Sequence, residues 1–87
     1  MQLIHHFTKV NGIRLHYVEA GSGPAVVLLH GFPETHRSWD LQMGALVAAG
    51  LRVIAPDLRG YGESARPSGG YDLDSLVRDV AGLCRQV

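Results

Sequence analysis

Residues 26–34 of this chain read VVLLHGFPE, an apolar run that ends in a tight loop. A continuously apolar run is typical of a strand that is covered on both faces, as in a parallel sheet. We therefore expect a buried strand over residues 25–29, with a loop at its carboxyl end. In open α/β sheets, chemistry gathers at the carboxyl ends of the strands. This loop is the first candidate for a functional site.

A β-hairpin is predicted before this strand. Asn11-Gly12 is a strong turn signal, because a type I′ turn needs a positive φ at both of its central residues. Residues 7–10 and 13–18 flank the turn, and the second range alternates apolar and polar side chains as a half-buried strand does. The cluster GSGP at residues 21–24 predicts a further turn before the apolar run.

After the loop, the sequence predicts a helix, a strand and a second helix. Apolar residues at helical spacing indicate a helix from about Thr35 or Ser38 to Ala49, and a strand at residues 51–55 follows it. The second helix begins near Asp72, a residue type that caps helices well. Alternating strands and helices predict βαβα units of a mostly parallel sheet, hence an α/β fold. A single domain over residues 1–87 is expected.

Charge and composition argue against several kinds of partner. The formal net charge of the 87 residues is zero, which gives no support for nucleic acid or an anionic membrane as partner. No apolar stretch approaches the roughly 18 residues that span a bilayer. The first residues lack the pattern of a signal peptide, so a cytoplasmic location is expected.

No metal or cofactor is expected from the sequence. The predicted hairpin carries His5, His6 and His16, but no carboxylate or cysteine stands at ligand spacing from them. Exposed strand histidines are far commoner than metal ligands. The chain also lacks the glycine-rich patterns that bind nucleotides.

A second loop with functional character follows the strand at residues 51–55 and reads DLRGYGES at residues 57–64. Its two glycines permit backbone conformations that other residues avoid. We expect the Asp57 carboxylate to pair with Arg59, and the Ser64 hydroxyl to bond to nearby backbone. The residues expected to shape this loop are Asp57, Arg59, Gly60, Gly62 and Ser64.

The two loops together resemble the N-terminal part of the α/β-hydrolase fold, most closely that of epoxide hydrolases. HGFP at residues 30–33 is similar to the family motif His-Gly-X-Pro, and DLRGYGES is similar to Asp-X-Arg-Gly-X-Gly-X-Ser. The resemblance implies that the Phe32 N–H contributes to an oxyanion hole. It also implies that His30, Gly31 and Pro33 shape the loop, with a cis Phe32-Pro33 peptide bond, and that His30 is not the catalytic base.

The resemblance further implies a small apolar epoxide or halogenated substrate. Phe32 and Trp39 are candidates to line its pocket, with packing in the helix core as the alternative for Trp39. In the resembled family an Asp nucleophile attacks the epoxide and a His-activated water hydrolyses the ester. Haloacetate dehalogenases, haloalkane dehalogenases and serine esterases have similar loops and stay as alternatives.

The family's nucleophile elbow has no counterpart among the 87 residues. The sequence is therefore interpreted as a fragment of a hydrolase, truncated before the nucleophile elbow, without a cap domain and inactive alone. Its strand at residues 25–29 is expected at an open sheet edge, which favours self-association. A non-catalytic module that associates through this edge is the remaining alternative.

Overall fold

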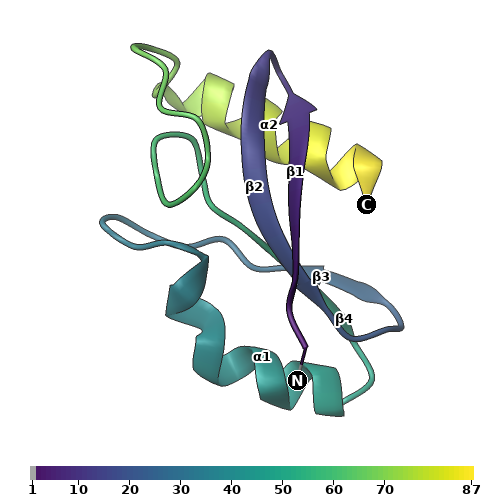
Figure 1. The fold of residues 1–87 in the computed structure, drawn as a ribbon. Helices are drawn as coiled ribbons and strands as arrows, with labels where there is room; N and C mark the ends of the chain where they lie inside the picture. Colours follow the sequence, from purple (N-terminus) through teal and green to yellow (C-terminus); the bar gives the residue numbers. More distant parts are fainter. Residues whose placement is uncertain (1) are drawn as a thin grey trace.

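The computed structural model describes residues 2–87, which form a four-stranded sheet and two α-helices (Figure 1). In chain order the elements are β1 (Ile4–Val10), β2 (Ile13–Ala20), β3 (Ala25–Val27), the 3₁₀ helix η1 (His36–Trp39), α1 (Asp40–Ala48), β4 (Arg52–Pro56) and α2 (Leu73–Gln86). The predicted hairpin, both helices and the strand between them are confirmed. The first helix differs in detail, because its opening turn is η1.

The strands pair in the order β1-β2-β4-β3. β1 with β2 and β2 with β4 are antiparallel, whereas β3 with β4 is parallel. The sequence predicted a mostly parallel sheet, but the sheet of residues 2–87 is mixed. The reason is that the hairpin joins β4 through β2, which runs antiparallel to it. The α/β class itself is confirmed.

The hairpin turn has the backbone that its sequence predicts. Asn11 and Gly12 have φ angles of 48° and 78°, so both central residues are left-handed as a type I′ turn requires. The Asn11 side chain then donates from Nδ2 to Oδ1 of Asp79 on α2, at 3.0 Å. The turn is thereby attached to the last helix of the chain.

The two helices cover opposite faces of the sheet, as the alternation of side chains along β4 shows. Val53 and Ala55 contact the cluster around Met43 of α1. Ile54, which lies between them, contacts Leu83 of α2 instead. Successive residues of a strand point to opposite faces, so one strand contributes to both halves of the core. In Figure 1 the sheet accordingly lies between α1 and α2.

β3 is shorter than predicted. Only Ala25–Val27 is strand, although the Leu28 N–H still donates to the Ile54 carbonyl at 2.9 Å. Leu29, expected inside the sheet, is 43% exposed. The cause is the position of β3, which is the last strand of the described sheet and has a neighbour on one side only.

The end of α1 and the start of α2 follow the sequence signals. Gly50, with a φ of 87°, ends the first helix in the left-handed conformation. The Asp72 side chain accepts the N–H of Ser75, and hydrogen bonds from the Ser75 side chain and backbone lower the pKa of Asp72. Among the described residues, no helix has the length and apolarity that crossing a membrane requires.

We expect the 87-residue chain to self-associate through the edge formed by β3 and the apolar side chains beside it, because unpaired strand edges attract further strands. Replacing the exposed Leu29 by Lys should reduce this association, since a charge beside the edge disfavours pairing. Light scattering over a concentration series measures it. The matched control is Leu41→Lys, which changes a 90% exposed leucine on α1. A monodisperse monomer at high concentration would contradict the expectation.

Candidate functional site

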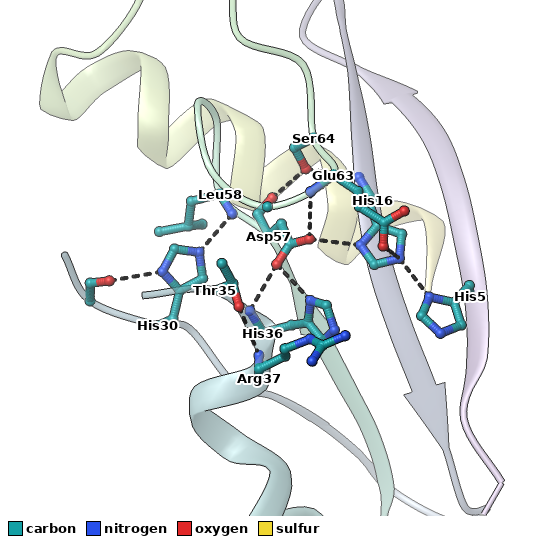
Figure 2. Close-up of polar contacts among 12 residues, drawn as sticks. His5, His16, His30, Thr35, His36, Arg37, Asp57, Leu58, Glu63 and Ser64 are labelled. Carbon is teal, nitrogen blue, oxygen red and sulfur yellow. Dashed lines mark hydrogen bonds and ion pairs between the residues drawn. The ribbon is translucent and has the colours of Figure 1, made fainter. Parts of the chain in front are cut away.

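The loop at the carboxyl end of β3 is held by the imidazole of His30. This ring is buried, and its Nε2 accepts the N–H of Leu58 at 2.9 Å (Figure 2). Because Nε2 accepts, the proton of the neutral ring lies on Nδ1, which donates to the Gly31 carbonyl at 3.0 Å. Both nitrogens are therefore occupied, and His30 connects this loop to the one that follows β4.

The turn after His30 leaves one backbone donor without a partner. The Glu34 N–H donates to the Gly31 carbonyl at 2.8 Å, and the Gly31 N–H donates to the Glu34 carboxylate at 3.3 Å. Among residues 2–87, no acceptor receives a hydrogen bond from the Phe32 N–H. Phe32 is 84% exposed, and the Phe32-Pro33 peptide bond is cis, as expected. The loop thus presents a fixed and available N–H group.

The carboxylate of Asp57, at the end of β4, is the most heavily bonded group in the structure (Figure 2). Its Oδ2 accepts from Nδ1 of His16 at 2.8 Å and from the Glu63 N–H at 3.0 Å. Its Oδ1 accepts from Nδ1 of His36 at 2.7 Å and from the backbone N–H of the same residue at 2.8 Å. One buried carboxylate therefore binds β2, η1 and its own loop.

These hydrogen bonds determine the charge state of Asp57. Burial alone raises the pKa of the carboxyl, but the N–H groups of Glu63 and His36 and the imidazoles of His36 and His16 outweigh burial and lower it to about 2. Asp57 is consequently a carboxylate at neutral pH. Each imidazole directs its Nδ1 proton at this carboxylate.

The rest of the second loop closes around the same carboxylate. The Ser64 hydroxyl donates to the Asp57 carbonyl at 2.6 Å and accepts the His16 N–H at 2.9 Å, the type of backbone bond expected for it. Gly60 and Gly62 have φ angles of 85° and 52°. A Cβ on Gly62 would also collide with the Asp57 carboxylate, so only glycine fits there.

The expected pair between Asp57 and Arg59 is wrong. Arg59 instead forms a two-pronged pair with Asp79 of α2, from Nε to Oδ2 and from a terminal nitrogen to Oδ1, both at 2.9 Å. Another Arg59 nitrogen donates to the Gly69 carbonyl at 3.0 Å. The hydrogen bonds that Arg59 donates to the Asp79 carboxylate raise the pKa of Arg59, outweighing burial. The physical reason is that Asp57 is already saturated by imidazoles and backbone.

The two aromatic candidates pack against different parts of the structure. Trp39 packs against the core cluster of Met43, in agreement with the alternative of helix packing. Phe32 lies over the second loop, with its ring centroid 6.4 Å from that of Tyr61. An apolar groove of about 460 Å³ lies between α2 and the ends of β3 and β4, and Leu29 and Leu58 are among its lining residues. Neither Phe32 nor Trp39 lines this groove.

Sequence reasoning missed three residues of this network, namely His16, His36 and Asp79. His16 alternates with apolar neighbours, which predicts an exposed position, yet its side chain is fully buried. The sequence does carry a signal for Asp79, because this carboxylate lies between Leu76 and Leu83 on the apolar face of the predicted helix. A buried carboxylate needs a positively charged partner, but the sequence does not say which side chain this is.

The fold and both loops indicate the class of protein to which this chain belongs. Residues 24–87 match the family described as the alpha/beta hydrolase fold, and the chain belongs to that family. It is similar to Bifunctional epoxide hydrolase 2 of Sus scrofa, with 55% identity over 81 residues that cover 90% of this chain and 15% of that protein. It is also similar to a Soluble epoxide hydrolase of Corynebacterium, with 46% identity over 82 residues, 94% of this chain and 28% of that protein.

Solved structures give the same result. An epoxide hydrolase from Vigna radiata superposes with a TM-score of 0.94 at 44% identity, over 97% of this chain and 27% of that one. The chain is thus an epoxide-hydrolase-like region of an α/β hydrolase. It spans less than a third of the length of these relatives.

We predict that Asp57→Asn lowers the free energy of unfolding at pH 7 by about 3 kcal/mol, because an amide leaves buried imidazole donors unpaired. The pKa of Asp57 is lowered from 3.8 to about 2, so its contribution is present above about pH 4 and is lost as the pH falls through 2. The difference between wild type and variant should therefore shrink by about 2 kcal/mol over this range.

Urea unfolding at a series of pH values measures both effects of the Asp57 substitution. Asp40→Asn is the control, since Asp40 is exposed at the start of α1. If the free energies of unfolding of wild type and Asp57→Asn differ by a constant amount from pH 5 to pH 2, the lowered pKa of Asp57 is contradicted.

Arg59→Lys should cost about 2 kcal/mol of stability, because an ammonium cannot reproduce the two parallel bonds to Asp79. Arg66→Lys is the matched control, since Arg66 is exposed and donates one bond to the Gly62 carbonyl at 3.0 Å. The control should change stability by less than about 0.5 kcal/mol. Equal effects of the two substitutions in thermal unfolding would show that the Arg59 geometry does not matter.

Proposed function

We propose that this chain is the N-terminal part of a hydrolase domain that opens small apolar epoxides, and that the Phe32 N–H is one donor of its oxyanion hole. The observation that carries the proposal is this unpaired N–H in a loop fixed by His30. The loop follows β3 at the carboxyl end, where open α/β sheets bind their ligands. The epoxide hydrolases among the relatives support the substrate class.

The proposed chemistry needs a donor at this point. A carboxylate nucleophile attacks an epoxide carbon; the ring C–O bond breaks, and the alkoxide that forms takes up a proton, which leaves a hydroxyalkyl ester. Water, which gives up a proton to a base, then attacks the carbonyl of this ester, and the acyl C–O bond breaks to release the diol and return the carboxylate. Negative charge develops on the carbonyl oxygen, and a backbone N–H already aimed at that oxygen stabilises it without reorganisation. The Phe32 ring would line the adjacent pocket. The nucleophile and the base that activates water would come from other parts of the hydrolase domain.

Dehalogenases and serine esterases would need the same donor, so the loop alone does not choose between them. The first experiment is to assay the protein that contains this chain with an epoxide, a haloacetate and a simple ester. We expect diol formation from the epoxide; halide release or ester cleavage alone would favour the alternatives.

We also propose a cytoplasmic location, which the name of the Corynebacterium relative supports.

A backbone ester at position 32 tests the donor itself. Replacing Phe32 by phenyllactic acid exchanges the N–H for an oxygen and retains the ring. The turnover number should fall by about 10²–10³, the usual effect of losing one oxyanion donor, while KM changes little. Steady-state kinetics on the epoxide measures both constants.

Phe32→Leu serves as the control, because it keeps the N–H and changes only the ring. This variant should alter KM more than the turnover number if the ring lines the pocket. Unchanged turnover in the backbone ester would exclude Phe32 as the donor, even if epoxide hydrolysis by the protein were established.

A further inference from the structure

A second cluster of polar side chains lies on the hairpin, outside the loop of residues 30–34. It consists of His5 on β1, His16 on β2 and Glu63 in the loop after β4, and we call it the hairpin cluster (Figure 2). Nδ1 of His5 lies 2.8 Å from Nε2 of His16, and a Glu63 carboxylate oxygen lies 3.6 Å from the same Nε2. The three potential ligand atoms all lie within 4.8 Å of one another.

His16 already has the geometry of a metal ligand. Its ring is fully buried and its Nδ1–H donates to the Asp57 carboxylate at 2.8 Å. This bond fixes the tautomer, so the lone pair of the neutral ring is on Nε2, where it accepts a hydrogen bond from Nδ1 of His5 at 2.8 Å. The Glu63 carboxylate lies beside the same atom. Metal-binding histidines are commonly oriented by a carboxylate in this manner, which also raises the basicity of the other nitrogen.

The other two members can adjust to an ion. His5 and Glu63 are both exposed at the surface, and the Glu63 side chain retains 58% of its accessible area. Ligands of a tetrahedral zinc ion lie about 3.3 Å apart, given metal–ligand distances of about 2.0–2.2 Å. Zn²⁺ would replace the hydrogen bond between the two rings: the Nδ1 proton of His5 would be released to solvent, and the two ring nitrogens would separate by about 0.5 Å. The exposed His5 ring would turn from its present stacking on His16 to do so. Solvent can supply a fourth ligand.

We propose that the hairpin cluster binds a divalent transition metal ion, with Zn²⁺ the best match. Two imidazoles and one carboxylate form a ligand set that zinc accepts readily, whereas Mg²⁺ and Ca²⁺ prefer oxygen ligands throughout. The sequence argued against a metal because the hairpin showed no carboxylate near its histidines. In the folded chain, the loop after β4 brings the Glu63 carboxylate beside the hairpin histidines, and His16 is buried rather than exposed. Neither argument against a metal therefore holds for the folded chain.

A neighbouring set of residues does not form a competing site. His16, His36 and Asp57 also lie within ligand distance of one another. In that set, however, the Nδ1 atoms of both rings already donate to the Asp57 carboxylate, which also accepts two backbone N–H groups. An ion there would have to displace these bonds in a fully buried position. The hairpin cluster is the one open to solvent.

The test is titration of the full, tag-free chain with ZnCl₂ in a non-chelating buffer, followed by calorimetry. We expect one ion per chain. His5→Gln and Glu63→Gln should each weaken Zn²⁺ binding by more than about tenfold. Both side chains are exposed, so both variants should fold, and circular dichroism checks this. Co²⁺ gives a second readout, because the visible absorption of a four-coordinate ion should be lost in both variants.

His6→Gln is the matched control, since His6 neighbours His5 on β1 but its Nε2 lies 2.9 Å from Glu19 instead. This variant should bind Zn²⁺ as tightly as the wild type. The proposal fails if the wild-type chain does not bind Zn²⁺. It also fails if folded His5→Gln and Glu63→Gln bind it as tightly as His6→Gln does. Neither result depends on hydrolase activity, so the proposed function is tested separately.

Discussion

The Asp57 carboxylate is the group on which the rest of this structure depends. It follows β4 directly and is fully buried. A buried carboxylate is stable only if hydrogen bonds replace its lost hydration. Here four donors from three parts of the chain do so. The arrangement of the hairpin, η1 and the second loop is therefore coupled to one charge.

Three consecutive residues extend this coupling to the remaining elements. Asp57 binds the hairpin and η1, the Leu58 N–H binds His30 in the first loop, and Arg59 binds Asp79 on α2. Because these residues follow β4 directly, each contact is positioned by the strand at the centre of the core. The sequence DLR thus connects one strand end to the hairpin, the first loop and the last helix.

Local sequence signals are sufficient to predict the helices, strands and turns, but they do not predict the contacts between these elements. Asn11-Gly12 determined the hairpin turn, and Asp72 determined the start of α2, because both act on backbone within a few residues. The bond from His16 to Asp57 joins residues 41 positions apart. Periodicity treats every polar residue as exposed, so it placed His16 in solvent. A pair between Arg59 and Asp57, two residues apart, is likewise a local prediction, whereas folding places Asp79 of α2 against Arg59.

The way the first loop is held also explains why its backbone donor stays available. Buried N–H groups in folded proteins are nearly always paired, and a turn is commonly closed by its own backbone. In this turn the N–H groups of Gly31 and Glu34 bond within the loop, and the His30 ring attaches the loop to the strand end. These contacts fix the loop without using the Phe32 N–H. The Phe32 N–H therefore stays unpaired among the described residues, which is the condition that the proposed role as an oxyanion donor needs, since no bond must be broken when the charge appears.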